Sequence, residues 1–265
     1  MSDIFDSMDF YLPDPGFDPG VFDDTDIYFP DPSLDPALLG PEPSLFDPWS
    51  TPSSFDLVPL GYWTEADPFG QDMIVTGLDP YWQSANLDWC QGDAVPGFDS
   101  TCGLTSVANV ANMFGVDLTE GEVVDFAYSN GLCSLGGGTF ETDQAALLNA
   151  AGIPAHWDVG GMTDLAQYVE EGRGVIAEVN AGVLWDDPSC FDGGMANHAI
   201  TVTGVARDAT GAVDGFFVCD SGRQSPEDVR RFVPADMMQL CWEYAGGNCV
   251  VTDAPRSQGY LPTYV

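Results

Sequence analysis

Residues 99–115 read DSTCGLTSVANVANMFG and combine a helix pattern with a cysteine at its start. Apolar residues recur in this segment at steps of three and four, which predicts a helix that buries one face. They are Leu104, Val107, Val110, Ala111 and Phe114. Thr101 is a favoured type for the helix N-cap, and Gly115 ends the pattern. Cys102 therefore lies in the first helical turn, where unpaired N–H groups and the helix dipole stabilise a thiolate.

Two other segments place polar residues at the ends of predicted strands. The β-branched run HAITVTGV predicts a strand that begins at His198, and the run FFVCD predicts another that ends at Asp220. A turn at residues 208–215 connects them, which favours an antiparallel hairpin. In such a pair the first residue of one strand lies opposite the end of the other, so we expect His198 and Asp220 to touch.

A thiol, an imidazole and a carboxylate are the components of a nucleophilic catalytic site. In this combination Cys102 is the candidate nucleophile, His198 its base and Asp220 the acid that orients the imidazole. Gln91 adds a side-chain amide that can donate to an oxyanion, together with the backbone N–H of Cys102. Each residue also has an ordinary structural interpretation, as a core cysteine, a core or surface histidine, a turn aspartate and a loop glutamine. His156 is a competing base, for which the sequence predicts no orienting acid.

The composition restricts the partners of the chain. Its 42 acidic residues face only 6 basic ones, all of them arginine, and the formal net charge is −36. Such a charge repels nucleic acid and anionic membranes and favours a basic or neutral peptide as substrate. The seven cysteines form no C-x-x-C pair, and only two histidines are present, so we expect no metal and no other cofactor. No signal-peptide pattern or membrane-length apolar run occurs, which predicts a cytoplasmic location unless secretion follows a non-standard route.

The chain divides into three parts by composition. Residues 1–75 are rich in proline and acidic residues and repeat an apolar-Asp-Pro unit, which predicts a disordered tail. Scattered aromatic residues suit this tail for docking on a partner protein or on its own domain, although a purely solubilising role is an alternative. Residues 76–255 have the composition of a globular domain, and residues 256–265 are a C-terminal tail.

The pattern of the central part predicts an α+β domain. Helices are expected around residues 119–131, 142–151 and 164–171, the last capped by Thr163. Short strands are expected at 153–159, 174–179 and 248–252, besides the hairpin of His198 and Asp220. Because helices come first and antiparallel strands follow, the order does not fit alternating parallel units.

Gln91, the CGLTS run at Cys102, the NHAITVTG run at His198 and the VCDSG run at Asp220 together resemble a papain-like cysteine peptidase. The resemblance is greatest to the bacteriocin-processing branch, cysteine peptidase family thirty-nine, and its stand-alone relatives, and it covers about residues 80–253. It implies a papain-like fold with N-terminal helices packed on an antiparallel sheet. It also implies the same four roles for Cys102, His198, Asp220 and Gln91.

The resemblance predicts a cysteine hydrolase of peptide or isopeptide bonds. A transglutaminase-like acyltransferase or deamidase is an alternative, because those enzymes use cysteine, histidine and aspartate in the same order. A third possibility is a catalytically silent domain that binds a partner through its acidic tail.

Overall fold

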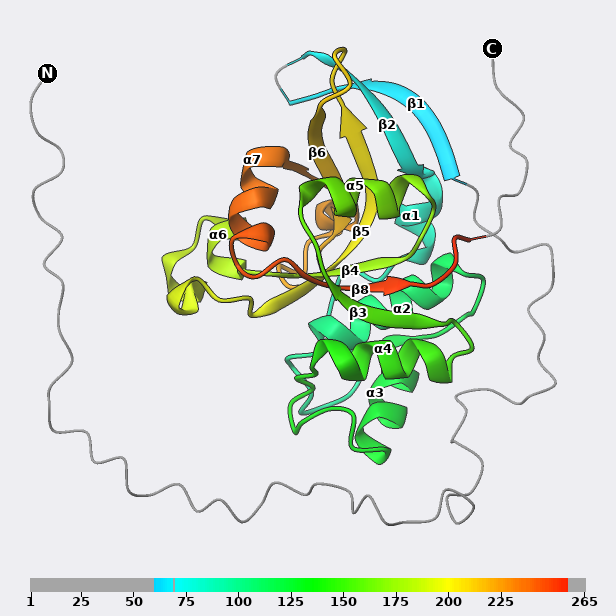
Figure 1. Cartoon of the computed structure of the whole chain (residues 1–265). Coiled ribbons are helices and arrows are strands. Elements are labelled where there is room, and N and C mark those ends of the chain that lie inside the picture. The colour runs from blue at the N-terminus through cyan, green and yellow to red at the C-terminus, as the bar shows by residue number, and fades with distance from the viewer. Residues whose placement is uncertain (1–59, 69, 257–265) are drawn as a thin grey trace, which may run out of the picture. The chain divides into compact units, whose positions relative to one another are not determined.

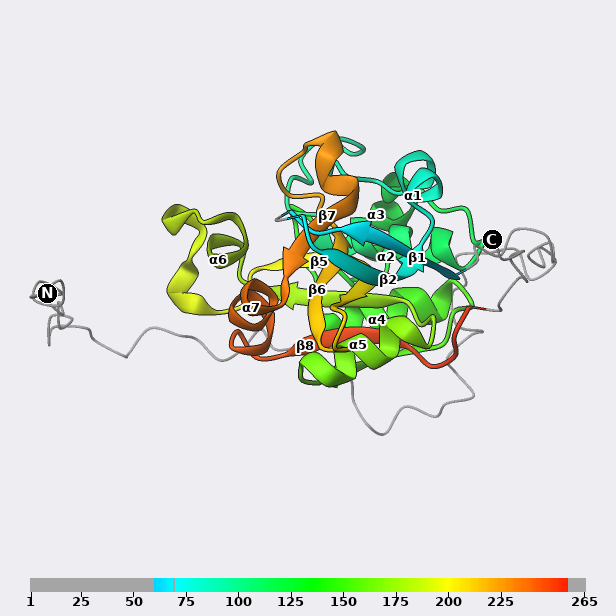
Figure 2. The same ribbon diagram turned by 90° about the horizontal axis from the view of Figure 1, so that it is seen from above.

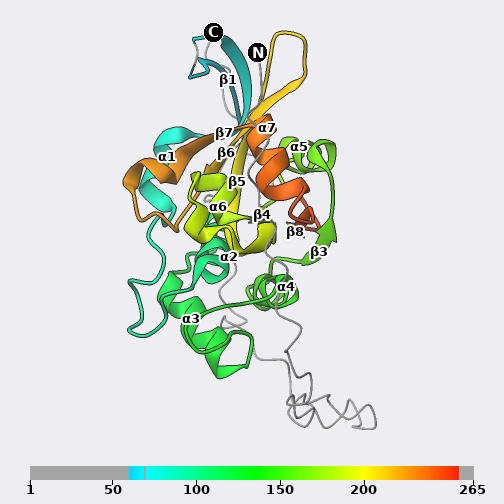
Figure 3. The same cartoon turned by 90° about the vertical axis from the view of Figure 1, so that its left-hand side faces the viewer.

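The computed structural model describes residues 60–68 and 70–256 (Figure 1). An eight-stranded antiparallel sheet forms its centre, in the order β1-β2-β5-β4-β8-β3, with β6 paired to β5 and β7 to β6. The strands are β1 (Leu60–Ala66), β2 (Asp72–Leu78), β3 (Ala155–Val159), β4 (Val175–Val179), β5 (His198–Arg207), β6 (Val213–Cys219), β7 (Arg231–Pro234) and β8 (Asn248–Thr252). The β1–β2 and β5–β6 hairpins project together beyond the helices (Figures 1 and 3).

Seven α-helices accompany the sheet in the described part of the chain. They are α1 (Pro80–Asn86), α2 (Cys102–Met113), α3 (Glu120–Ser129), α4 (Glu141–Ala150), α5 (Met162–Glu170), α6 (Ala181–Trp185) and α7 (Ala235–Met238). A π-helical turn at Gln239–Glu243 continues α7, and short 3₁₀ turns lie at Pro188–Cys190, Asp192–Gly194 and Pro226–Arg230. Helix α6 and the two 3₁₀ turns after it protrude from one side of the domain (Figures 1 and 2). The combination of helices with an antiparallel sheet confirms the predicted α+β class.

The core has two main parts, one on each face of the sheet. Helices α2, α3 and α4 cover one face, with Leu104 and Leu147 among its fully buried residues (Figures 1 and 3). Helix α5, α6 and the α7 region fill the other, around Trp242. Strand β4 contributes to both, because Ile176 packs toward α2 whereas Val175 and Ala177 pack on the opposite side.

The expected start of the domain at residue 76 was wrong, because it falls inside β2. Strand β2 pairs with both β1 and β5, and its Met73 and Val75 are buried. The Asp79-Pro80 pair directly after β2 begins α1. Asp79 caps α1 by accepting hydrogen bonds from two backbone N–H groups, and Pro80 occupies the first helical position. The remainder of the expected tail, up to residue 59, and residues 257–265 lie outside the described residues.

The predicted helix ends were right in one case and wrong in another. Thr119 and Glu122 form the expected capping box at α3. Helix α5, however, begins at Met162 with Gly161 as its N-cap, so Thr163 lies inside the helix. The side chain of Asp164 accepts a hydrogen bond from the backbone N–H of Gly161 at 2.9 Å, whereas Gly161 has no side chain to cap the N–H groups of the first turn. Among the described helices, none is both long and apolar enough to cross a membrane.

Candidate active site

Helix α2 presents Cys102 as its first residue, with a partly exposed side chain. Thr101 occupies the N-cap position, but its side chain does not cap the helix. Its hydroxyl donates to the carboxylate of Glu120 instead. The free N–H groups of the first turn therefore remain available to stabilise negative charge beside Cys102.

The β5–β6 hairpin brings His198 and Asp220 into contact. The register pairs Thr201 with Cys219, so the start of β5 lies next to the residue that follows β6. His198 Nε2 lies 2.8 Å from Asp220 Oδ1. Only 4% of the His198 side chain and none of the Asp220 side chain is exposed, so this hydrogen bond is shielded from water.

Three further donors orient the Asp220 carboxylate. Trp185 Nε1 and Arg231 Nη1 donate to Oδ2 at 2.7 and 3.3 Å, and the Gly222 N–H donates to Oδ1 at 3.1 Å. Burial raises the pKa of Asp220. The hydrogen bond and charge of His198 lower it, as do the bonds from Trp185 and Gly222, and the net direction is downward. The carboxylate is therefore ionised and held in one orientation.

Trp185 and Gly222 cover one side of the imidazole. The Trp185 ring lies 5.0 Å from that of His198, centroid to centroid, at an interplanar angle of 56°. A Cβ at Gly222 would approach Trp185 to 2.6 Å and His198 Cε1 to 2.8 Å. A glycine is thus required for this close approach, which keeps water from that part of the histidine.

The Cys102 side chain lies close enough to His198 to act on the pKa of the imidazole. Because Nε2 is bonded to Asp220, Nδ1 is the ring nitrogen left for the thiol. Burial lowers the pKa of His198, but the hydrogen bonds and charges of Asp220 and Cys102 more than offset this and raise it to about 10. This environment favours the protonated form of His198.

Gln91 lies in the loop between α1 and α2, attached to the segment that follows Asp220. Its N–H donates to the carbonyl of Ser221 at 3.3 Å, and its Oε1 accepts from Ser221 Oγ at 3.1 Å. Its Nε2 donates to the carbonyl of Asp99 at 3.4 Å, a long hydrogen bond. The side-chain amide is therefore anchored at its oxygen and weakly held at its nitrogen, near the segment that leads into Cys102.

A buried carboxylate joins this loop to α2. Glu120 accepts from the Gly92 N–H at 2.7 Å, from Thr105 Oγ1 at 3.2 Å and from the hydroxyl of Thr101. Glu120 is only 3% exposed. One charged group thus ties the residue after Gln91 to the N-terminal turn of α2, which restricts movement of Gln91 relative to Cys102.

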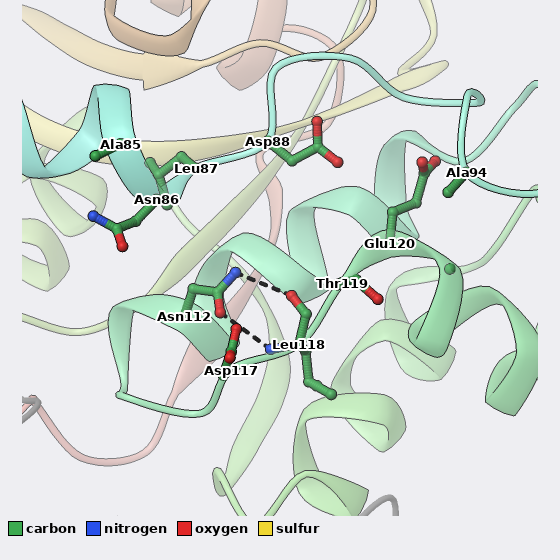
Figure 4. A pocket seen from close by; sticks show the side chains of 11 residues that line it. Ala85, Asn86, Leu87, Asp88, Ala94, Asn112, Asp117, Leu118, Thr119 and Glu120 are labelled. Atoms are coloured by element: carbon green, nitrogen blue, oxygen red, sulfur yellow. Dashed lines mark hydrogen bonds between the residues drawn. The ribbon is translucent and has the colours of Figure 1, made fainter.

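Glu120 also borders a pocket on the far side of this loop (Figure 4). Asp88 and Asp117 line it as well, and two hydrogen bonds between Asn112 and Leu118 close its lower wall. The triad candidates are absent from its lining. In the described part of the chain, no group of three or more potential ligands could hold a metal ion, and all seven cysteines are free.

His156 differs from the expectation that it would have no acid partner. It lies on β3, and its Nδ1 is 2.6 Å from Asp253 Oδ1. The reason is that β3 pairs with β8, so the residue just after β8 reaches the imidazole. Both side chains are about half exposed, and it is His198 that contacts Cys102.

The sequence pattern did not predict the positions of two side chains at this site, Arg231 and Glu178. Arg231 holds Asp220 and also donates to the Leu184 carbonyl at 2.7 Å, which ties α6 to the triad. The only signal in the sequence was that arginine is rare in this chain. Glu178, on β4, lies beside His198 but is an isolated acidic residue in an apolar strand.

A protein-family model matches residues 77–250, a segment that contains Gln91, Cys102, His198 and Asp220. Its description is "Peptidase_C39 like family". The chain belongs to this family. As a member of the Peptidase_C39 like family it is a cysteine peptidase, in agreement with the resemblance inferred from the motifs.

Two solved structures are similar to the Peptidase_C39 like chain. One is a double glycine motif protease from an AMS/PCAT transporter in complex with the leader peptide, with 14% identity, a TM-score of 0.41 and coverage of 62% of this chain and 89% of that one. The other is a C39-like peptidase from Bacillus anthracis, with 14% identity, a TM-score of 0.46 and coverage of 66% and 97%. No curated protein sequence matched the chain.

Proposed function

We propose that the chain hydrolyses peptide bonds with Cys102 as nucleophile, His198 as general acid and base, and Asp220 as the group that orients His198. The observation that carries this proposal is the 2.8 Å hydrogen bond between His198 and Asp220, with Cys102, the first residue of α2, interacting with the same imidazole. Nucleophile, base and orienting acid are linked in the order that nucleophilic catalysis requires.

The first half of the reaction forms a thioester. The Cys102 thiolate attacks the peptide carbonyl carbon, and the carbonyl electron pair moves to oxygen. When this tetrahedral intermediate collapses, the C–N bond breaks and the His198 imidazolium gives its proton to the departing amine. Asp220 keeps the imidazole ring oriented during this transfer through its bond to Nε2.

The second half regenerates the enzyme. His198, now neutral, removes a proton from water as the water attacks the thioester carbonyl. Collapse of the second tetrahedral intermediate breaks the C–S bond and releases the carboxylic acid product. The thiolate of Cys102 and the imidazolium of His198 are then restored, so the net reaction consumes one water per bond.

Gln91 and the backbone N–H of Cys102 are proposed to stabilise the oxyanion. The first N–H groups of a helix have no intrahelical acceptor, which leaves that of Cys102 available. Within the described residues, the Gln91 amide nitrogen makes only the 3.4 Å bond to Asp99, which an oxyanion can replace. The negative charge of the chain and the proposed site favour a basic or neutral peptide as substrate.

Hydrolysis in H₂¹⁸O separates the proposed reaction from its acyltransferase and deamidase alternatives. Peptide hydrolysis adds one ¹⁸O to each new C-terminal carboxylate. Acyl transfer to an amine adds none, and deamidation adds ¹⁸O to an uncut glutamine side chain. We expect digestion of a random peptide library to yield labelled, shortened peptides by mass spectrometry. Amine adducts or uncut labelled peptides would contradict the proposal.

Gln91→Ala is expected to lower kcat about 100-fold, because one of two oxyanion donors is lost. KM should change little, since the interaction is strongest in the transition state. Ser221→Ala, which removes only the anchor on Gln91 Oε1, should have a smaller effect. Steady-state kinetics on one cleaved peptide provide the comparison. A Gln91→Ala enzyme with wild-type kcat would remove Gln91 from the mechanism.

A further inference from the structure

The mechanism leaves one acidic residue beside the triad without a role. Glu178 lies on β4, directly opposite Ala199 on β5, whereas Val179 lies opposite His198. Side chains alternate along a strand, so Glu178 shares its face with Ile176, which packs toward α2. Glu178 is also the only residue of β4 that is not fully buried. Its carboxyl group is therefore on the α2 side of the strand next to His198 and reaches solvent there.

A hydrogen bond connects Glu178 to α4, next to the start of α2. Gln144 of α4 is 1% exposed, and its Nε2 donates to Glu178 Oε1 at 2.8 Å. Gln144 Nε2 in turn lies so close to Gly103 that a Cβ there would approach it to 2.6 Å. The other amide atom, Gln144 Oε1, is buried without a partner. Gln144 thus holds the carboxyl group beside the residue that follows Cys102.

No arginine in the described part of the chain forms an ion pair with Glu178, and the one positive charge that acts on its pKa is that of His198, which is bonded to Asp220. The five described arginines that form ion pairs do so with Glu65, Glu170, Glu171, Asp220 and Asp228. The sixth, Arg256, donates to the Gly172 carbonyl. One oxygen of Glu178 accepts from Gln144, and no bond is formed by the other. An unpaired, partly accessible carboxyl group beside a nucleophile is suited to receive a cation from outside the chain.

We propose that Glu178 determines the specificity of the peptidase by pairing with a lysine or arginine side chain of the substrate close to the scissile bond. The inference rests on the proposed function and adds a substrate class to it. Substrate binding would supply the ion-pair partner that Glu178 lacks in the described part of the chain. The same carboxylate would disfavour an acidic side chain there, by like-charge repulsion.

The pairing should depend on pH. Burial raises the pKa of Glu178 to about 7. The charge of Glu141 also raises it, whereas Gln144 and the charge of His198 lower it. The titratable groups that interact with Glu178 through their charges are Glu141 on α4, His198 on β5 and Cys249 on β8. Glu178 is charged above pH 7 and becomes neutral as the pH falls through that value, so a preference for basic residues should fade on acidification.

The test compares arginine with citrulline, which has nearly the same shape but no charge. The substrates are derived from a peptide that is cleaved in the ¹⁸O experiment. Each of the three positions on either side of the scissile bond is replaced in turn by arginine or by citrulline. At pH 8.5 and 0.5 M salt, which screens the general acidic surface, the arginine peptide should have about tenfold higher kcat/KM at one position. This ratio should fall toward one at pH 5.5.

Glu178→Gln keeps the size of the side chain and its bond to Gln144 but removes the charge. In this variant the arginine/citrulline ratio should lie near one at both pH values. Glu171→Gln, which removes an equal charge at the end of α5, should retain the wild-type ratio. If the Glu178→Gln enzyme still prefers arginine over citrulline, the inference about Glu178 is wrong. The same holds if the wild-type enzyme cleaves the peptides with no such preference at any position. Neither result would contradict the proposed peptidase activity. Absence of thiol-dependent cleavage of every peptide would overturn the proposed function, and the inference with it.

Discussion

Cys102→Ala is expected to abolish peptide hydrolysis, with a loss in kcat on the order of 10⁵-fold or more. Alanine has no group that can form the thioester, and the remaining His198 and Asp220 cannot replace a covalent nucleophile. The fold should persist, because Cys102 is partly exposed and its side chain leaves only a small space. The measurement is the initial rate on a cleaved peptide, together with thermal unfolding of the variant.

Cys190→Ala is the matched control for this prediction. Cys190 is also a free, partly exposed thiol, and it lies in a 3₁₀ turn. Its removal should leave the rate within twofold of wild type. Equal loss of activity in both variants would indicate a general effect of thiol removal, and activity retained in Cys102→Ala would exclude Cys102 as the nucleophile.

Asp220→Asn is expected to lower kcat on the order of 10³-fold. All four partners of the Asp220 carboxylate are donors, namely His198, Trp185, Arg231 and the Gly222 N–H. An amide presents one NH₂ group to these donors, so at least one hydrogen bond must be lost. The substitution also removes the negative charge that stabilises the His198 imidazolium, which weakens its pairing with the Cys102 thiolate.

The pH dependence of kcat/KM provides a second test of the role of Asp220. The active pair needs a protonated His198, which exists below the pKa of that histidine. Because Asp220 and Cys102 raise this pKa to about 10, wild-type kcat/KM should fall only as the pH rises through about 10. In Asp220→Asn the alkaline limb should move to lower pH. Asp253→Asn, which disrupts the other His–Asp pair, should leave the limb in place. An unmoved limb in Asp220→Asn would contradict the role of Asp220.

Local pattern predicted the elements that carry the triad. Helix α2 and strand β5 each follow one uninterrupted periodicity, and the turn at residues 208–215 admits only a short connection between β5 and β6. Contact between His198 and Asp220 follows from that connection alone. Cys102, His198 and Asp220 could be selected from the sequence because each lies at, or next to, the end of a regular element. Their catalytic roles stay predictions.

The misplaced domain start has a physical explanation. An Asp-Pro unit at Asp79 is compatible with an extended chain and equally with a helix that begins at the proline. Only the pairing of β2 with β5, about 130 residues later in the chain, decides between the two. Short-range pattern contains no information on such a partner. The same limit applies to His156, whose acid Asp253 is brought to it by the β3–β8 pairing.

The groups that support the site were harder to predict for a related reason. Glu120 follows an ordinary capping residue, and its sequence position indicates a solvated first turn. Its burial results from the Gln91 loop, which folds over it and donates the Gly92 N–H. Glu178 is similar, since its environment is made by Gln144 and by the start of α2. Residues whose role depends on three separate segments leave no periodic signal.

Competitive alkylation of the native chain at pH 6.5, read by mass spectrometry for each of the seven cysteines, tests the thiolate–imidazolium pair most directly. Burial raises the pKa of Cys241 and of Cys249 to about 12, and it raises that of Cys219 as well. Burial and nearby carboxylates also raise the pKa of Cys90 and of Cys133. Cys102 should react at least tenfold faster than every other thiol, because His198 stabilises its thiolate, and His198→Ala should abolish this advantage. Equal alkylation of Cys102 and Cys190 in the wild-type chain would contradict the account.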